Sequence, residues 1–173
     1  MPSCFGIVEI LFSSKILRTR TLEITHGEIT LINGPNLNRL GVREPGIYGT
    51  ATLEDIEGNT IKSGQDLGFA VDCHQSNFEG ELIDFLHNSD GNAGVIINPG
   101  ALTHYSYALR DAIASISTPC VEVHISNIYA REEFRRHSVI SPVVLGVISG
   151  FGIMGYDLAL QVIARHVCKK SSL

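Results

Sequence analysis

Short apolar runs and stretches with helical spacing alternate along the chain. Five runs rich in β-branched residues are bounded by turn-forming residues, which is typical of buried strands. These predicted strands cover residues 28–33, 69–74, 93–98, 120–125 and 143–148. Between and after them, apolar residues recur at the spacing of one helix face. The predicted helices cover residues 52–67, 79–88, 106–116 and 155–168.

Strict alternation of strand and helix predicts a parallel sheet with helices on both of its faces. Five strands of this length suit an α/β fold of the doubly wound, flavodoxin-like kind, with one five-stranded parallel sheet. The first 27 residues do not follow the alternation. We therefore expect residues 28–173 to form a single domain and residues 1–27 to be an N-terminal extension. Three interpretations of the extension stay open: a strand-like segment, a mobile arm, or sequence upstream of a misplaced start.

Composition narrows the class of protein. A chain of 173 residues that is 44% hydrophobic can bury one sizeable core. No apolar run approaches the roughly 18 to 20 residues of a membrane-spanning helix, so a transmembrane protein is excluded. The formal net charge of −5 argues against a general nucleic-acid-binding surface. Small molecules and further copies of the chain are the expected partners.

The four cysteines are widely spaced and form no C-x-x-C pair, which indicates reduced thiols in a cytosol. The first residues lack the basic and long apolar regions of a secretion signal. The cytoplasm is therefore the expected location.

Ligands of open α/β sheets bind just beyond the carboxyl ends of the strands. Four of the five predicted strand ends are rich in Asn, Ser, Thr or His, more than turns alone require. The five segments cover residues 33–38, 75–77, 98–104, 122–127 and 149–152. Because these ends converge on one edge of a sheet, the pattern favours a binding site there.

The connection after the first predicted strand is longer than the usual 2 to 6 or so residues and contains Arg43 and Tyr48. A tyrosine can act as a general base only when its pKa, near 10 in model peptides, is lowered. A neighbouring cation such as Arg43 favours the phenolate. The alternative is a surface tyrosine packed on its loop beside a solvated arginine.

Glu122 and His124 lie two residues apart on a predicted strand, so their side chains point to the same side. The carboxylate could orient the imidazole and favour its protonated form, which makes His124 a candidate general acid. Two alternatives remain open: a structural histidine satisfied by backbone groups, and a metal site that adds His104. No metal-ligand spacing such as H-E-x-x-H supports the second alternative.

Arg131 and Arg135 are four residues apart, on one face if this stretch is helical. Such a pair can be a solvated face that is neutralised by Glu132 or Glu133. In an acidic protein, however, two arginines just after a strand end suit a carboxylate or phosphate ligand. An anion is therefore the expected ligand.

Residues 150–155 match the pattern G-x-G-x-x-G. A dinucleotide fingerprint opens a βαβ unit and has an acidic residue about 20 positions later. Here the chain ends soon after Gly155, without a further predicted strand. These glycines are better explained by close packing of a strand against a helix.

Several segments together resemble type II 3-dehydroquinate dehydratase. The match runs in order from about Glu28 to the last predicted helix, and the set is far more specific than any one member. The segments are NGPNLNRLG (33–41), REPGIYG (43–49), QSNFEGELID (75–84), NPGALTH (98–104), ALRD (108–111), EVHISN (122–127) and AREEFR (130–135).

The resemblance implies a shikimate-pathway enzyme that removes water from 3-dehydroquinate to give 3-dehydroshikimate, without a metal or organic cofactor. It implies that Tyr48 takes the proton next to the ketone and that Arg43 favours its phenolate. His124, supported by Glu122, would protonate the departing hydroxyl. A water near Asn36 would stabilise the enolate.

The same resemblance assigns the remaining site residues. Asn98, His104, Ile125, Ser126 and Arg135 would hold the carboxylate and hydroxyls of the substrate. Arg131 would organise the lid, and Asp111 would reach into the site of a neighbouring subunit. The family's assembly is a dodecamer of four trimers, and residues 28–173 would be its catalytic domain.

Departures from the family pattern leave every proposed catalytic position filled. They are the first 27 residues and the tyrosines at 105, 107 and 129, which could alter packing beside His104.

Two alternative functions make different demands on the chain. A Schiff-base dehydratase needs an active-site lysine, and none of Lys15, Lys62, Lys169 and Lys170 lies at a strand end with the other groups. A non-enzymatic binding module of the same fold would lack turnover.

Overall fold

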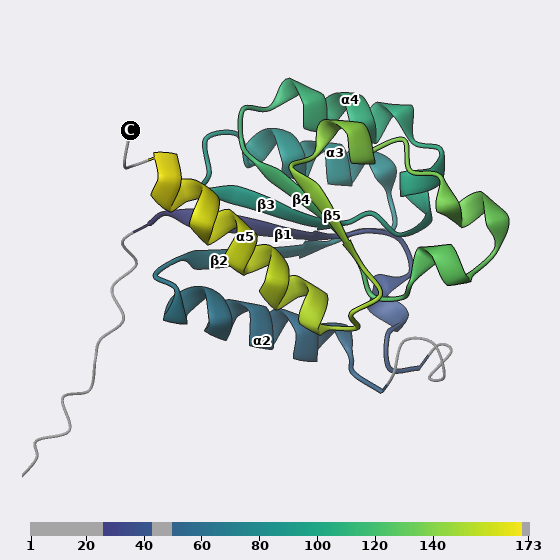
Figure 1. The fold of residues 1–173 in the computed structure, drawn as a ribbon, viewed down its shortest axis with the longest axis horizontal. Coiled ribbons are helices and arrows are strands. Elements are labelled where there is room, and N and C mark those ends of the chain that lie inside the picture. The colour runs from purple at the N-terminus through teal and green to yellow at the C-terminus, as the bar shows by residue number, and fades with distance from the viewer. Residues whose placement is uncertain (1–25, 43–49, 171–173) are drawn as a thin grey trace, which may run out of the picture.

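The computed structural model describes residues 26–42 and 50–170, and its centre is a five-stranded sheet (Figure 1). The strands are β1 (Glu28–Asn33), β2 (Ala70–Gln75), β3 (Gly94–Asn98), β4 (Cys120–His124) and β5 (Gly146–Ser149). All neighbours pair in parallel, in the order β2-β1-β3-β4-β5. This order is the flavodoxin-like, doubly wound arrangement, so the predicted fold class is confirmed.

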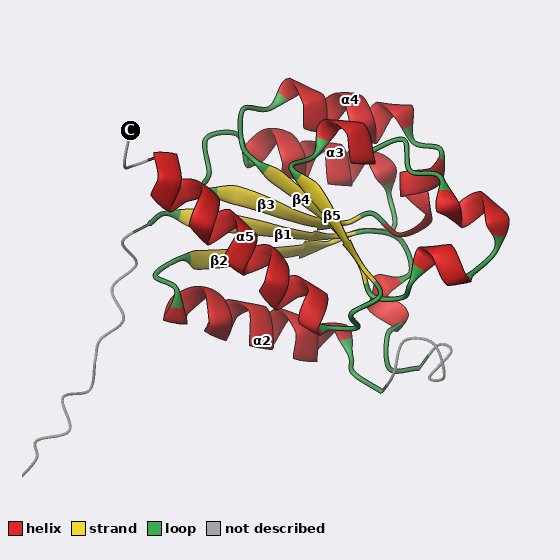
Figure 2. Ribbon diagram, viewed as in Figure 1, coloured by secondary structure: helices red, strands yellow, loops and turns green. Residues whose placement is uncertain are grey.

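Helices cover both faces of the sheet (Figure 2). They are α2 (Leu53–Asp66), α3 (Glu79–Asn88), α4 (Tyr107–Ser115) and α5 (Met154–Lys170). α2 and α5 pack on one face, and α3 and α4 pack together on the other. All four predicted helices are confirmed to within about two residues at each end.

The sheet is buried on both sides, which is why its strands read as continuous apolar runs. In β1, Leu31 faces the core under α2 and α5, whereas the next residue, Ile32, faces the core under α3 and α4. β3 divides its apolar side chains in the same way, with Ile96 on one side and Ile97 on the other. The two cores hold the strand ends at one edge of the sheet.

The fifth strand is shorter than predicted. Its ladder begins at Gly146, and Ser141–Val143 forms a 3₁₀ turn instead of the start of a strand. Pro142 lies at the beginning of this turn and has no backbone N–H for a ladder. The β-branched residues Val143 and Val144 therefore misplaced the predicted start of the strand.

The stretch that contains the two predicted binding arginines is not a continuous helix. It forms two 3₁₀ turns, η3 (Ile128–Ala130) and η4 (Glu133–Arg136), with Arg131 in extended backbone between them. The condition under which Arg131 and Arg135 would share one helix face is therefore not met. Their side chains nevertheless meet through Glu132, as described below.

The glycines of residues 150–155 serve the junction between β5 and α5. Gly150 has a φ of 91°, which favours glycine. A Cβ on Gly155 would lie 3.2 Å from Val123 Cγ1, closer than ordinary packing. The prediction that these glycines allow close strand-to-helix packing is confirmed.

Within residues 26–42 and 50–170, no helix has both the length and the apolarity needed to cross a membrane.

Candidate active site

A cavity of about 140 Å³ opens at the carboxyl edge of the sheet, where the loops after β1, β3 and β4 converge. Backbone and side chains from residues 35–40, 98–104 and 124–135 line it. The structure therefore has a cavity where the strand ends predicted a binding site, and the polar loops after three different strands line it.

Most of the predicted site residues line this cavity. They are Asn36, Asn98, His104, His124, Ile125, Ser126, Arg131 and Arg135. Glu122 lies behind His124 and contacts it directly. Arg43 and Tyr48 lie outside the described residues. Asp111 is not part of the cavity: it is on α4, its side chain is 74% exposed, and it pairs with Arg110.

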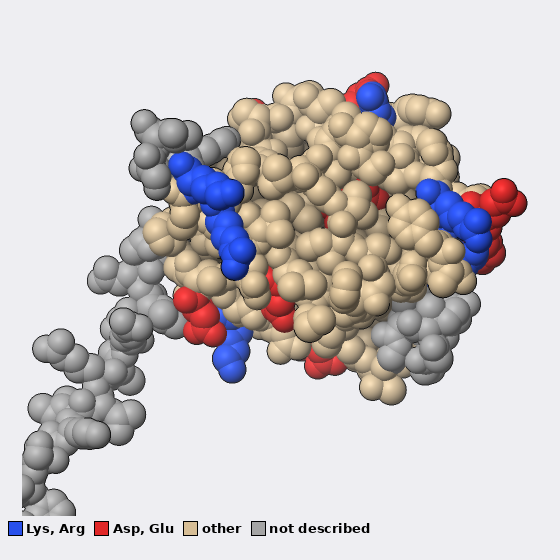
Figure 3. Space-filling model, in the orientation of Figure 1, with Lys and Arg blue, Asp and Glu red and all other residues tan. Residues whose placement is uncertain are grey.

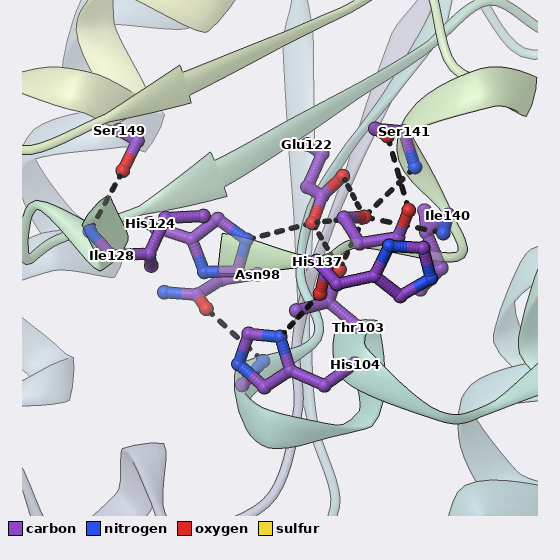
Figure 4. A network of polar contacts seen from close by, with 12 residues as sticks. Asn98, Thr103, His104, Glu122, His124, Ile128, His137, Ile140, Ser141 and Ser149 are labelled. Carbon is purple, nitrogen blue, oxygen red and sulfur yellow. Dashed lines mark hydrogen bonds and ion pairs between the residues drawn. The ribbon is translucent and has the colours of Figure 1, made fainter. Parts of the chain in front are cut away.

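His124 and Glu122 form a buried pair at the end of β4 (Figure 4). The two side chains lie on the same side of the strand, as predicted, and His124 Nε2 is 2.7 Å from Glu122 Oε1. Because a carboxylate only accepts, Nε2 carries the hydrogen and donates it. Nδ1 is then the nitrogen available to the cavity, where it accepts in the neutral ring and donates in the charged one.

Two hydroxyl groups complete the surroundings of Glu122, which is fully buried. Thr103 donates to Oε1, and Ser138 lies 3.2 Å from Oε2 (Figure 4). Ser138 Oγ also accepts the backbone N–H groups of Ile140 and Ser141. Those two bonds occupy its lone pairs, so its single hydrogen is left for Glu122 or Thr103. Hydrogen-bond donors thus surround the Glu122 carboxylate.

His104 is held by a different kind of partner. Its Nδ1 lies 2.7 Å from the carbonyl oxygen of His137, so Nδ1 must carry the hydrogen. Partial burial lowers the pKa of His104 below 6.5, and nearby positive charge at Arg135 acts in the same direction. The ring is therefore neutral at pH 7, and Nε2 can accept a hydrogen bond from a ligand hydroxyl.

Arginines give the cavity its positive charge. Arg135 Nε lies 2.7 Å from Glu132 Oε2, and Arg131 Nε lies 3.5 Å from the same oxygen. The hydrogen bond from Arg135 lowers the pKa of Glu132, which keeps the carboxylate charged. Figure 3 shows basic beside acidic side chains at the edge of the molecule where η4 lies. Glu132 orients both guanidinium groups, and Arg131 also donates to Ser126 Oγ at 3.4 Å.

Arg39 adds a third arginine to the cavity wall. Arg39 lies inside the family-like segment 33–41, but the resemblance assigned it no role. Thr103 and Ser138 were also missed as site residues. Thr103 lies inside a quoted segment next to His104, so that position offered a signal, whereas nothing near Ser138 in the sequence points to Glu122.

Asn36 reaches the cavity from an unusual backbone conformation. Its φ of 69° lies in the left-handed region, which asparagine tolerates better than most residues. Its N–H donates to Asn77 Oδ1 at 2.8 Å. The loop after β1 is thereby tied to the loop after β2 at the edge of the sheet.

The tyrosines that depart from the family pattern do not pack into the cavity. Tyr105, Tyr107 and Tyr129 are each more than half exposed, at 62%, 66% and 59%.

Among the described residues, no group of three His, Cys, Asp or Glu side chains is arranged to hold a metal ion. Glu122 contacts Thr103, Ser138 and His124, and one ring nitrogen of His104 and one of His124 are bonded to other protein groups.

Comparison with known proteins decides the family. The model of class II dehydroquinases matches residues 27–164. The chain belongs to the class II dehydroquinase family. Two relatives are the 3-dehydroquinate dehydratase 1 of Agrobacterium fabrum, 61% identical over 134 residues, and the 3-dehydroquinate dehydratase of Halalkalibacterium halodurans, 59% identical over 133 residues. Those alignments cover 77% and 76% of this chain and 92% of each relative.

Solved structures of class II dehydroquinases have the same fold. The type II dehydroquinase of Propionibacterium acnes superposes with a TM-score of 0.78 and 46% identity, covering 83% of this chain and 99% of that one. The enzyme of Butyrivibrio crossotus gives 0.78 and 48%, covering 80% and 97%. The resemblance seen in the sequence motifs is thereby confirmed over the domain that carries the cavity.

Proposed function

We propose that this class II dehydroquinase converts 3-dehydroquinate to 3-dehydroshikimate and water at the cavity beyond the carboxyl ends of β1, β3 and β4. The observation that carries the proposal is the buried pair of His124 and Glu122 at the wall of a cavity lined with arginines. The pair is suited to deliver a proton, and the arginines are suited to an anionic substrate.

The acid half of the reaction is argued from His124. In the charged ring both nitrogens carry hydrogen, Nε2 donates to Glu122, and Nδ1 can donate to the departing hydroxyl of the substrate. Glu122 holds the ring in this orientation and balances its charge, as the carboxylate of a catalytic triad does. Loss of the C–O bond then releases water, and the ring is left neutral.

The base half rests on the family motif, because Arg43 and Tyr48 lie outside the described residues. In this proposal the Tyr48 phenolate takes a proton from the carbon next to the ketone, and Arg43 favours the phenolate. The electron pair of the broken C–H bond moves into an enolate, which is stabilised near Asn36. Separating proton abstraction from hydroxyl departure divides a difficult elimination into two steps.

The substrate contacts follow from the cavity wall. Arg135 is suited to the carboxylate, since its guanidinium is already oriented by Glu132. The neutral His104 is suited to accept from a hydroxyl. Asn98, Ile125 and Ser126 line the cavity beside it and are proposed to complete the contacts. Arg131 is proposed to organise the segment that covers the site.

The decisive assay follows the conjugated enone of 3-dehydroshikimate by its ultraviolet absorbance when purified protein meets 3-dehydroquinate. We expect the enone to appear with and without a metal chelator. A well-folded wild-type protein that forms no enone would contradict the proposal and favour a binding module. Turnover that a chelator abolishes would contradict the metal-free mechanism.

Variants separate the roles of the proposed residues. Tyr48→Phe and His124→Ala should each lower kcat by on the order of 10²-fold or more, because each removes a proton-transfer group. Arg135→Ala should instead raise KM. The melting temperature of each variant serves as the control for folding. Wild-type kcat in both of the first two variants would overturn the role assignments.

We further propose that residues 28–173 form the catalytic domain of a cytoplasmic homo-oligomer, a dodecamer of four trimers, in which Asp111 serves the site of a neighbouring subunit. Two observations support the last point: Asp111 is exposed, and it lies outside the cavity of its own chain. Sedimentation equilibrium of the full chain measures the oligomeric state.

A further inference from the structure

A second buried network adjoins the cavity through Asn98. It joins three side chains that are distant in sequence: Asn33 at the end of β1, Asn98 at the end of β3, and Tyr156 in the first turn of α5. All three are at most 3% exposed. Only Asn98 also lines the cavity.

The contacts of this network give each hydrogen bond a direction, and they leave Asn33 Nδ2 buried without a partner among the described residues. The N–H of Gly100 lies 3.2 Å from Asn98 Oδ1, which must therefore be the oxygen of the amide. Asn98 Nδ2 then donates to the hydroxyl oxygen of Tyr156 at 2.9 Å. The one hydrogen of that hydroxyl goes to Asn33 Oδ1, also at 2.9 Å.

This arrangement leaves Asn98 Nδ2 with a second hydrogen. Among the described residues no second protein acceptor meets Nδ2, and Asn98 lines the cavity, so this hydrogen is available to a bound substrate. If the amide were turned over, its NH₂ group would face the N–H of Gly100, and two donors would oppose each other. The protein therefore presents a donor, not an acceptor, to the ligand at this position.

The glycine-rich junction before α5 brings Tyr156 to this place. Gly155 packs so closely on β4 that its Cβ would lie 3.2 Å from Val123 Cγ1. The first turn of α5 thus lies against the sheet, and the next residue, Tyr156, reaches beneath the ends of β1 and β3. Burial raises the pKa of the Tyr156 hydroxyl, so it stays protonated and continues to donate to Asn33.

We propose that Tyr156 is a positioning residue for substrate binding: its hydroxyl, braced by Asn33, holds the amide of Asn98 with an N–H directed to the substrate. Tyr156 itself does not line the cavity and acts through Asn98. The proposal deepens the proposed function and rests on it, because it assumes that the cavity binds 3-dehydroquinate. It also gives the segment GFGIMG a purpose, which is to seat this tyrosine.

The test is the Tyr156→Phe variant, which keeps the buried ring and removes only the hydroxyl. Without that acceptor the Asn98 amide is held on one side only, and its N–H is no longer presented in one direction. We expect KM for 3-dehydroquinate to rise roughly five- to tenfold, the equivalent of one lost hydrogen bond, with kcat changed less than about twofold. Unchanged KM in a folded variant would overturn the proposal.

A double variant shows whether Tyr156 acts through Asn98. If it does, Tyr156→Phe combined with Asn98→Ala should have the same KM as Asn98→Ala alone, since the amide to be positioned is already gone. Additive increases in KM would overturn the proposal, because Tyr156 would then act by another route. This non-additivity is not expected of a purely structural tyrosine.

Two further variants guard against a general effect on folding. Thr60→Val removes another buried hydroxyl, on α2 and bonded to Ile56 O at 2.7 Å, and should leave KM unchanged. Asn33→Leu removes the acceptor of the Tyr156 hydrogen and should raise KM in the same direction as Tyr156→Phe, which keeps the test open if that variant fails to fold. A Thr60→Val protein with an equal rise in KM would overturn the proposal.

The wild-type assay comes first, because it tests the proposed function separately from the role of Tyr156. A folded wild-type chain without turnover contradicts the proposed function and, with it, this inference. A wild-type chain with turnover whose Tyr156→Phe variant keeps the parent KM contradicts the inference alone.

Discussion

The two imidazoles of the cavity are held by different partners, and this difference sets what each can do. His124 donates to a buried carboxylate, so a positive charge on its ring is compensated. His104 donates to the carbonyl of His137, which carries no full charge, and partial burial lowers its pKa. One ring is therefore suited to deliver a proton and the other to accept a hydrogen bond.

The lowered pKa of His104 predicts a pH dependence of stability. Between the folded-state pKa and 6.5, the unfolded chain binds more protons at this ring than the folded chain does. The stability contributed by the neutral ring is thus present above about 6.5 and lost as the pH falls. The free energy of unfolding of the wild type minus that of His104→Gln should decrease from pH 7 to pH 5, as measured by urea denaturation. A difference that is constant or grows on acidification would contradict this assignment.

We expect kcat to depend far more on the charge of Glu122 than on one hydroxyl group beside it. Glu122→Gln keeps the size of the side chain, but it removes the charge that balances His124 and places an amide group among donors. We expect kcat to fall by on the order of 10²-fold, measured by the enone assay. Ser138→Ala removes one donor and should lower kcat by less than about tenfold. The reverse order of the two effects would show that Ser138, not the carboxylate charge, governs the site.

At the scale of elements, α2 shows how position within a helix decides the effect of a glycine. Gly58 and Gly64 are both in this helix, six residues apart. A Cβ on Gly58 would meet no atom within 4 Å. A Cβ on Gly64 would collide with Val71 of β2, because the helix lies directly on the sheet there.

The same substitution should therefore have opposite effects at the two glycines. Gly58→Ala should raise the free energy of unfolding by about 0.5 to 1 kcal/mol, because alanine restricts the unfolded chain and favours the helix. Gly64→Ala should lower it by about 1 to 3 kcal/mol through overpacking. Thermal or urea unfolding of the two variants beside the wild type measures both. Equal effects would mean that the contact of α2 with β2 is not as close as described.

The start of α2 is fixed by a reciprocal cap. Thr52 Oγ1 accepts from the N–H of Asp55 at 3.1 Å, and Asp55 Oδ2 accepts from the N–H of Thr52 at 2.9 Å. The bond from the Thr52 N–H lowers the pKa of Asp55 most strongly, and the Thr52 hydroxyl, which donates to Asp55 Oδ2 at 2.7 Å, lowers it further. Thr52→Ala should cost about 1 kcal/mol in the free energy of unfolding. Thr52→Ser, which keeps the hydroxyl, is the matched control and should lose clearly less.

At the scale of the whole molecule, the doubly wound topology places the side chains of the candidate site at one edge of the sheet. Loops after three parallel strands contribute to one cavity, although they are separated by long stretches of chain. In Figure 3 the centre of the face is mostly tan, whereas blue side chains lie over α5. Exposed apolar residues lie along β5 and its junction with α5: Leu145, Val147, Phe151, Ile153 and Met154. Such a surface fits the homo-oligomer proposed above.

The proposed sharing of Asp111 between subunits predicts complementation. Asp111→Ala and His124→Ala homo-oligomers should each be nearly inactive, for different reasons. When the two proteins are unfolded together and reassembled, some sites combine an intact His124 with a neighbour's intact Asp111, and activity should reappear. Reassembly of each variant alone is the control. Mixed assemblies that stay as inactive as the parents would contradict a shared site.

Local physics was enough to predict most of the fold from the sequence. The apolar runs and helical spacing depend on neighbouring residues, so the helices, the strands and the edge that carries the site could be read from them. β5 was misplaced by three residues because the β-branched residues before it outweighed Pro142. The spacing of four between Arg131 and Arg135 left their arrangement open, because it places them on one face only if the segment is helical, and the segment forms two 3₁₀ turns instead.

The candidate site divides in the same way. Pairs close in sequence, such as Glu122 and His124, have a relative orientation that the strand itself determines, and the sequence alone predicted it. Thr103 and Ser138 reach Glu122 from 19 and 16 residues away, and Tyr156 reaches Asn33 across 123 residues. Only the folded chain brings such groups together, because hydrogen bonds act over about 3 Å and no local pattern records which distant segments will meet. The sequence by itself therefore determined which edge of the sheet carries the candidate site. The tertiary structure decided which distant side chains position the residues of that site.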